Sequence, residues 1–563
     1  MSGNLETVPQ SQYAVQLIGP SKLKLNKAKE VVAPGPRQIL ARVEAVGLCF
    51  SDLKLLQQFS AHPRKSSVVG GIPKAVLDEI PSYKPDDLPT VPGHEVVCRI
   101  VAVGGKVARH RVHQRILVQA DYRNIKTAES NGAFGYNFEG GLQEYILMDE
   151  RVVIEQPSGE SYLIPAVADL SASAVALVEP WGCVENSYAT RERQTIKAAG
   201  RLLVVVEDGF AVEGLAESLS PAGGPASVTA VCAHEAQNRP IEALGLAVDR
   251  AGGGDELPDE SFDDIVYFGA GKEGIDALND KLAARGIFNI VLAGRKIGRP
   301  VSVGVGRLHY GKTRWIGTVS TSAAEAYKMI PPTGEIRPGD RVIVIGAGGP
   351  MGQMHTIRTI CLGLEGVSVV AADLDDARLE SLRQKAQHLA NQRGVPLRMV
   401  NSRTQPPADK FSYFALMAPV PQLVARAIAD SQPGALVNVF AGIPTAVRHD
   451  LDMDACIEKR CFLFGTSGSR IVDMKVVLDK VTAGQLDTNC SLDAISGMAG
   501  AIDGIAAVKN RTLAGKIVVY PMLHEMPLIR LSDIGGRFPT VAARLDRGMW
   551  TKAAEEELLN VAK

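Results

Sequence analysis

The sequence predicts an α/β protein in which a β-rich N-terminal domain is followed by two tandem doubly wound parallel-sheet domains. Its 563 residues, 46% hydrophobic and 22% charged, suffice for about three or four domains with large cores. Up to about residue 200 the apolar runs are short and alternating, which favours antiparallel strands. Beyond that point they are near-continuous and separated by helical stretches, as in parallel strands covered on both faces.

The charges and cysteines restrict the partners. Lys and Arg number 61 against 62 Asp and Glu, and this balance argues against a protein that binds nucleic-acid phosphates. No apolar run approaches the ~18–20 residues of a membrane span, and the N-terminal MSGNLETVPQ lacks the pattern of a signal peptide. The eight cysteines are too scattered for a disulfide framework. We therefore expect a cytoplasmic protein with neither nucleic-acid nor membrane partners.

The N-terminal domain is expected to span residues 1–190. Glycine, proline and charged residues interrupt its apolar runs, a pattern typical of a barrel-like or meandering antiparallel fold. The runs that predict strands are ILARVEAVGL (39–48), HEVVCRIVAVG (94–104) and RILVQA (115–120).

The C-terminal part of the chain is expected to complete this domain. Segment 501–521 predicts one helix and one strand, and a lone strand needs a sheet to join. We therefore assign 488–525 to the N-terminal domain. Residues 526–563 are expected to form an extension that ends in an exposed amphipathic helix over 550–563.

Two stretches of the chain repeat one α/β plan. Residues 262–294 align with 411–442 at almost the same length. Each stretch is followed at the same spacing by a similar signature, IGTVSTS from Ile316 and FGTSGSR from Phe464. This self-similarity predicts duplication of one Rossmann-type domain. The two copies are expected at residues 195–332 and 335–487.

The second copy opens with a predicted dinucleotide-binding turn. In RVIVIGAGGPMGQMHTIRTI, from Arg341, a buried strand leads into glycines and then a helix, the context that such a turn requires. Glycines let the backbone approach a pyrophosphate, whose charge a helix N-terminus favours. The residues assigned to this turn are Gly346, Gly348, Gly349, Pro350, Met351 and Gly352.

An acid ends the next strand of this copy. Asp373 lies 21 residues beyond Gly352, where a carboxylate accepts hydrogen bonds from a ribose diol and repels a 2′-phosphate. Strand, glycines, helix, strand and acid in this order predict an NAD site. A structural turn in a cofactor-free domain is the alternative.

The first copy contains a second glycine-rich string, GAGKEG from Gly269. With Arg295 following 21 residues after its last glycine, the string alone would suggest an NADP site. The repeat alignment, however, places the string after a later strand. The opening turn of this copy carries Glu207 and Asp208 without a glycine triple, and two carboxylates there oppose a pyrophosphate. We expect a structural copy that binds no dinucleotide; an NADP site is the alternative.

The N-terminal domain carries residue types that bind metals. VGLCFSDLK supplies Cys49, Ser51 and Asp52; VPGHE supplies His94 and Glu95; LVEPWGCVENSY supplies Glu179. Thiolate, imidazole and carboxylate are ligands of a catalytic Zn²⁺, whose fourth position is left to water or substrate. Cys49 and His94 lie 45 residues apart, so the residues show no local metal spacing, and each alone also fits a structural role.

Five segments taken together resemble the zinc-dependent medium-chain alcohol and polyol dehydrogenases. In order they are GLCFSDLK, LPTVPGHEVVCRIVAVG, LVEPWGCVENSY, RPGDRVIVIGAGGPMG and LAGKIVVYP. The resemblance covers about residues 10–190 and 335–525, so the first α/β copy is extra to it. GYNFEGGLQEYILMD and GALVNVFAG are closest to the sorbitol dehydrogenase side of the family, and to L-sorbose-1-phosphate reductases in particular. The resemblance implies a GroES-like fold for the N-terminal catalytic domain.

The resemblance assigns roles residue by residue. It implies that Cys49, His94 and Glu179 bind one catalytic zinc, with Glu95 as an adjacent, exchanging ligand. Ser51 matches the hydroxyl that passes the substrate proton, and Asp52 the acid that orients the zinc-bound histidine. Lys54 stands where many relatives have a relay histidine. In the NAD domain, the matching residues are Asp373 and Arg378 at the adenosine ribose and Phe440, Ala441, Gly442 and Thr466 at the nicotinamide.

The sequence departs from the family in two places. No cysteine occurs between Cys98 and Cys183, so we expect no structural zinc. Residues 57–90 form a long insertion between the first two predicted zinc ligands, which we expect near the mouth of the cleft, where it would reshape the substrate pocket.

The predicted function is hydride transfer between NAD(H) and a polyol, sugar or sugar phosphate by a zinc-dependent oxidoreductase, expected to be a homo-oligomer. Two alternatives stay open. The spacing of Gly346, Gly349 and Gly352 also occurs in zinc-free reductases of the quinone-oxidoreductase type. The extra domain and C-terminal helix also fit a non-catalytic assembly protein that responds to NAD(H).

Overall fold

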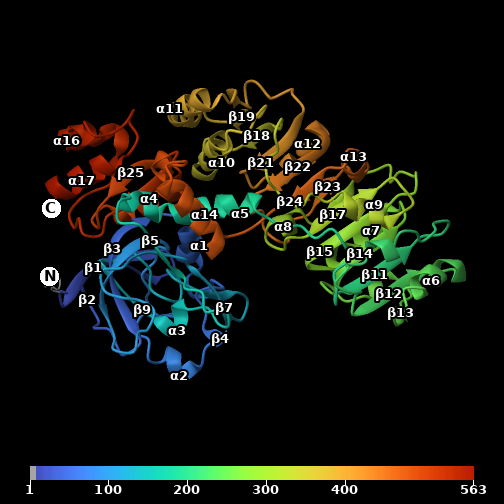
Figure 1. Ribbon diagram of the computed structural model, residues 1–563, viewed down its shortest axis with the longest axis horizontal. Helices are drawn as coiled ribbons and strands as arrows, with labels where there is room; N and C mark the ends of the chain where they lie inside the picture. Colours follow the sequence, from blue (N-terminus) through green and yellow to red (C-terminus); the bar gives the residue numbers. More distant parts are fainter. Residues whose placement is uncertain (1–7, 563) are drawn as a thin grey trace. The chain divides into compact units, whose positions relative to one another are not determined.

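The computed structural model describes residues 8–562, which form two compact units (Figure 1). The first contains the chain up to Glu185 together with the segment from Ser469 onward, and the second contains Asn186–Gly468. Most of the N-terminal segment considered for a signal peptide lies outside the described residues. Across residues 8–562, no helix is both long and apolar enough to cross a membrane.

The first unit is built on an eight-stranded sheet with β3 (Gln38–Gly47) at its centre. β3 pairs antiparallel with β5 (Glu95–Val103) on one side and β26 (Lys516–Val519) on the other, so blue and red segments lie together in Figure 1. β26 is the strand expected to return to this domain. The sheet is completed by β6 (Arg115–Val118), β9 (Tyr145–Asp149), β10 (Leu163–Pro165), β25 (Leu492–Ser496) and β27 (Ile529–Arg530).

Smaller elements surround this sheet. The strands are β1 (Ser11–Gly19) with β2 (Lys22–Glu30), and β4 (Val68–Gly70) with β7 (Asp121–Thr127) and β8 (Asn131–Ala133). The helices are α1 (Phe50–Gln58), α2 (Lys74–Leu77), α3 (Glu150–Val153), α4 (Ala172–Ala176), α5 (Val178–Tyr188), α14 (Ile471–Thr482), α15 (Ala501–Asn510), α16 (Pro539–Ala542) and α17 (Lys552–Val561).

The C-terminal segment differs from expectation in two respects. Residues 469–487, assigned to the NAD domain from sequence, belong to the first unit, because Met474 of α14 packs on Gly182 and Lys480 pairs with Glu185 at 2.9 Å. The terminal helix α17 is half-buried rather than exposed: the Glu555 carboxylate accepts hydrogen bonds from the first backbone amides of α4 and from Tyr520. It therefore satisfies donors that the start of a helix leaves open.

The second unit contains two six-stranded parallel sheets with the same strand order. In the first repeat the order is β13 (Val248–Arg250), β12 (Ser227–Cys232), β11 (Arg201–Val206), β14 (Phe262–Phe268), β15 (Leu282–Val291) and β17 (Arg314–Thr318). In the second it is β20 (Leu397–Asn401), β19 (Ser368–Asp373), β18 (Arg341–Ile345), β21 (Phe411–Leu416), β22 (Ser431–Val439) and β24 (Phe462–Phe464). This is the doubly wound architecture predicted from the repeated apolar runs.

Helices flank both sheets, and one short strand pair joins the repeats. The first repeat has α6 (Glu235–Glu242), α7 (Lys272–Leu278), α8 (Val305–His309) and α9 (Ala323–Lys328); the second has α10 (Pro350–Cys361), α11 (Asp376–Arg393), α12 (Gln422–Asp430) and α13 (Met453–Glu458). β16 (Val301–Val303) of the first repeat pairs antiparallel with β23 (His449–Leu451) of the second. One hydrophobic core runs through both repeats.

Candidate active site and dinucleotide turn

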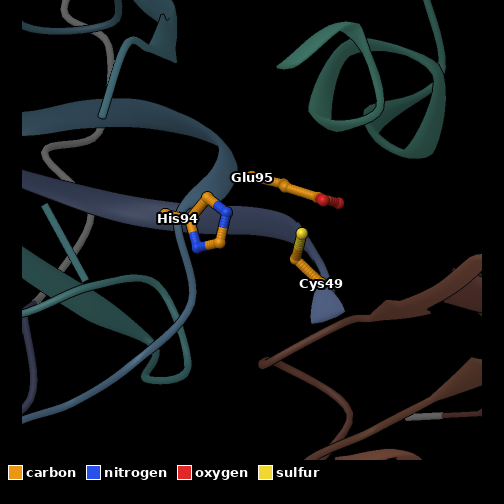
Figure 2. Close-up of side chains that lie close together, drawn as sticks. All are labelled: Cys49, His94 and Glu95. Carbon is orange, nitrogen blue, oxygen red and sulfur yellow. The ribbon is translucent and has the colours of Figure 1, made fainter. Parts of the chain in front are cut away.

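Three metal-binding side chains converge where β3 ends and β5 begins. Cys49 follows β3 and caps the N-terminus of α1, whereas His94 and Glu95 lie at the start of β5. The antiparallel register places Gly47 directly opposite Glu95, so the two strand ends meet. The cysteine sulfur, an imidazole nitrogen and a carboxylate oxygen lie within 4.8 Å of one another, and Figure 2 shows the side chains pointing toward one another.

The first turn of α1 orients these groups. Ser51 Oγ donates to Cys49 Sγ at 3.1 Å and lies 3.2 Å from His94 Nε2. Asp52 Oδ1 lies 2.9 Å from His94 Nδ1, and its second oxygen accepts from the Cys49 amide. A carboxylate at Nδ1 holds the proton on that nitrogen and leaves Nε2 free to bind a metal.

Two predicted residues lie apart from the group. Glu179, in the first turn of α5, is not among the three clustered ligands; its Oε1 accepts from Ser469 Oγ at 3.3 Å and from Cys183 Sγ at 3.7 Å. Burial raises the pKa of Glu179 to about 7. Lys54 lies on the exposed face of α1.

Lys516 is a site residue that the sequence analysis missed. It is 5% exposed, and its Nζ donates to Glu95 Oε1 at 2.5 Å and to the Leu48 carbonyl at 2.6 Å. Burial lowers its pKa, but the charges of Glu95, Cys49 and Glu179 and the hydrogen bond to Glu95 together outweigh this and raise the pKa of Lys516 to about 12. The sequence did contain a signal for this residue, since Lys516 begins the apolar strand KIVV. A lysine buried in such a strand needs an opposite charge to pair with.

The insertion at 57–90 also contributes side chains beside the cluster. The His62 ring lies 5.1 Å from the Tyr136 ring, which in turn lies 5.8 Å from the His94 ring. Burial is the main cause that lowers the pKa of His62 to about 4. Arg64 pairs with Asp121 at 2.7 Å. The sequence analysis did not single out His62, Arg64, Asp121 or Tyr136, because these contacts join residues that lie far apart along the chain.

The glycine turn of the second repeat has the backbone that its sequence requires. Gly346 has φ +83°, which favours glycine, and a Cβ on Gly352 would collide with the Gly346 carbonyl. The Gly348 amide donates to Asp373 Oδ2 at 2.8 Å, and a Cβ on Gly348 would press on Arg378. The turn, the acid and the arginine are therefore adjacent.

The remaining predicted cofactor residues follow the expected elements. Pro350 and Met351 form the first turn of α10. Ala441 and Gly442 follow β22, and Thr466 follows β24, so these three lie past the carboxyl ends of parallel strands, where ligands bind in such sheets. Thr466 is 3% exposed, and its hydroxyl has no hydrogen-bond partner among residues 8–562.

The first repeat has an acid where the second has its glycine turn. Glu207 follows β11, and its carboxylate accepts from the amides of Ala270 at 2.8 Å and Gly271 at 3.1 Å. It thereby occupies the backbone donors of the GAGKEG string. Between β11 and β12 the described chain forms only the short 3-10 turn Ala216–Ser218, so the helix that would receive a pyrophosphate is missing.

Comparison with known proteins identifies one domain of the chain and several distant relatives. Residues 35–158 match the alcohol dehydrogenase GroES-like domain. The N-terminal part of the chain therefore contains an alcohol dehydrogenase GroES-like domain. It is 26% identical over 245 residues to the uncharacterized protein YggP of Escherichia coli, covering 40% of this chain and 57% of that protein. It is 26% identical over 164 residues to the uncharacterized zinc-type alcohol dehydrogenase-like protein YphC of Escherichia coli, covering 27% and 42%.

The solved structures support the fold. The chain is similar to 2R,3R-butanediol dehydrogenase from Bacillus subtilis, with a TM-score of 0.51 and 14% identity over 91% of this chain and 100% of that one. This likeness agrees with the predicted α/β fold of a GroES-like domain and Rossmann-like domains. The chain matches less than two thirds of the length of the curated relatives above.

The Glu95–Lys516 pair gives a stability prediction. Lys516→Met should lower the free energy of unfolding of the metal-free protein by about 3–5 kcal/mol, because it leaves a buried carboxylate without its counter-charge. The double variant Lys516→Met/Glu95→Gln should recover most of this loss. Urea denaturation measures both, with the exposed Lys509→Met as control. Equal stability of Lys516→Met and Lys509→Met would contradict the prediction.

Proposed function

We propose that this protein is a zinc- and NAD-dependent dehydrogenase that interconverts a secondary alcohol and a ketone of a polyol, sugar or sugar phosphate. The observation that carries the proposal is the group of Cys49, His94 and Glu95, whose ligand atoms lie within 4.8 Å. Sulfur, imidazole and carboxylate donors suit Zn²⁺. Glu95 Oε2 is buried without a hydrogen-bond partner in the described structure, which is expected of an oxygen that binds a metal ion.

The chain's own groups support this chemistry. When bound, zinc supplies a Lewis acid for the substrate oxygen, and NAD accepts or gives the hydride. Ser51 Oγ, adjacent to Cys49 Sγ and His94 Nε2, is positioned to take up or return the substrate hydroxyl proton. Asp52 keeps the His94 ring in its metal-binding tautomer. Lys516 balances the Glu95 charge, whereas Glu179 Oε1 accepts from Ser469 and Cys183.

The second repeat fits NAD. The Gly346 turn and the start of α10 leave room for a pyrophosphate, because nothing but the Gly346 carbonyl, at 3.9 Å, lies near a Cβ built on Gly349 among the described residues. Asp373 stands at the end of β19 to accept from the ribose diol. The unpartnered Thr466 hydroxyl offers a hydrogen bond to the nicotinamide amide.

The metal ligands give the first test of the function. Cys49→Ala or His94→Ala should remove bound zinc and lower kcat/KM more than about a hundredfold, since each withdraws a ligand from one metal. Metal analysis and an NADH-coupled assay with sugar alcohols and their phosphates measure this. Cys98→Ala, a buried cysteine within β5, should keep both. A zinc-free wild-type protein with full turnover would support the quinone-oxidoreductase class instead.

Asp373 gives a test of cofactor preference. Asp373→Ser should lower the NAD-to-NADP ratio of kcat/KM by about tenfold, a difference of about 1.4 kcal/mol, because the repulsion of the 2′-phosphate is lost. Steady-state kinetics with both cofactors measures it. Asp376→Ser, in the first turn of α11, is the control. A wild-type preference for NADP would refute the assignment.

The occupied string of the first repeat predicts one cofactor per chain. Glu207 already holds the amides of Ala270 and Gly271, so a pyrophosphate finds no free donors there. Calorimetric titration with NADH should give a stoichiometry of about one per chain. Gly352→Ala should abolish binding, whereas Lys272→Ala in the string should leave it unchanged. Two NADH per chain, or lost binding in Lys272→Ala, would mean that the first repeat binds the cofactor.

A further inference from the structure

The two repeats pack through a self-complementary interface. Gly294 and Gly317 of the first repeat correspond to Gly442 and Gly465 of the second. The same offset makes Ser302 correspond to Asp450. These last two residues are paired directly where β16 meets β23, with Val301 opposite Leu451 and Val303 opposite His449. Equivalent residues thus meet at the centre of the pairing, which is the signature of a local two-fold axis between two copies of one domain.

A second pair of contacts obeys the same symmetry. A Cβ on Gly465 of the second repeat would press on His309 of α8, and a Cβ on Gly317 of the first would press on Ile457 of α13. His309 and Ile457 are equivalent positions. His309 Nδ1 also lies 3.3 Å from the Val439 carbonyl at the end of β22, which anchors α8 beside the strand ends of the second repeat.

The symmetry breaks at the next position. Tyr310, which ends α8, reaches over the second repeat, and a Cβ on Gly442 would collide with its hydroxyl. Its equivalent is Glu458, which pairs with Lys296 at 4.0 Å, and no described atom lies within 4 Å of a Cβ built on Gly294. The aromatic ring is therefore present on the side of the repeat with the glycine turn and absent from the other.

Tyr310 lies beside the part of the second repeat that would hold the second mononucleotide of a bound dinucleotide. The glycine turn and Asp373 bind the adenosine side of a dinucleotide, and the carboxyl ends of β21, β22 and β24 receive the second mononucleotide. Gly442 and the unpartnered Thr466 hydroxyl lie at these ends. The Tyr310 ring contacts the His309 ring edge-on, with centroids 4.6 Å apart. The residue is 38% exposed, so part of its surface is accessible to a planar group.

We infer that Tyr310 of the first repeat contacts the nicotinamide half of a dinucleotide bound to the second repeat. The first repeat, which binds no dinucleotide itself, then acts as a built-in partner that completes the cofactor pocket. This inference rests on the proposed function. It gives the duplicated domain a role that its own occupied turn does not provide.

The test compares Tyr310→Ala with its symmetry-related control, Glu458→Ala, in the full-length chain. Two ligands are titrated into each: NADH, and ADP-ribose, which lacks the nicotinamide. Tyr310→Ala should raise the Kd of NADH roughly five- to tenfold, the size expected for one lost aromatic contact, and leave the Kd of ADP-ribose unchanged. Glu458→Ala should change neither.

The other outcomes overturn the inference. An unchanged NADH Kd in Tyr310→Ala would show that the ring makes no contact with the cofactor. Equal weakening of NADH and ADP-ribose would show that Tyr310 only supports the fold. If the wild type bound ADP-ribose as tightly as NADH, the nicotinamide would add nothing to the affinity, and the proposed contact with Tyr310 would be refuted. The assignment of the dinucleotide turn would still stand. Failure of the wild type to bind either ligand would refute the proposed function, and the inference with it.

Discussion

The pairing of β3 between β5 and β26 brings Cys49, His94 and Glu95 together. β3 delivers Cys49, β5 delivers His94 and Glu95, and β26 delivers Lys516 from 421 residues further along the chain than Glu95. Gly47 must lack a side chain, because a Cβ there would overlap the Glu95 carboxylate. The site therefore depends on a long-range strand pairing whose cost in loop-closure entropy grows only slowly with the length of chain between the strands.

This dependence explains which parts of the molecule could be predicted from sequence. The apolar runs at 201–207 and 341–345 predicted buried parallel strands because local composition decides that question. The matching signatures after residues 294 and 442 predicted the repeat. By contrast, the Glu95–Lys516 pair and the capping of α4 by Glu555 join distant segments. Residues 469–487 group with the first unit and not with the expected NAD domain for the same reason, since their contacts with α5 leave no local signal.

The two repeats share a fold but differ in the segment that follows their first strand. Their sheets have the same strand order, and one hydrophobic core serves both. In the second repeat, glycines form the turn before α10, and only the Gly346 carbonyl lies within 4 Å of a Cβ built on Gly349 among the described residues. In the first, Glu207 supplies the anion from within the chain and takes the amides at the start of α7. Because packing rather than the turn holds the sheet together, the fold of the first repeat does not depend on an open glycine turn.

The duplication also provides an internal control for unpartnered polar atoms. Asn289 and Asn438 occupy equivalent positions on β15 and β22, and the side-chain oxygen of each is buried without a partner among residues 8–562. An atom left open in both copies belongs to the fold. Thr466 differs: its hydroxyl is open, whereas that of its equivalent, Thr318, accepts from the Ser320 amide at 3.0 Å.

Burying a hydroxyl without a hydrogen-bond partner destabilises a protein unless a ligand or a water molecule supplies the partner. In the repeat whose opening turn is occupied by Glu207, the chain itself satisfies the threonine at the end of the last strand. In the repeat with the glycine turn, the threonine after β24 has no partner among residues 8–562, and Tyr310 lies against Gly442 after the neighbouring strand β22. The comparison of the two copies thus separates Thr466, whose hydroxyl is open in one copy only, from Asn289 and Asn438, whose oxygens are open in both and belong to the sheet.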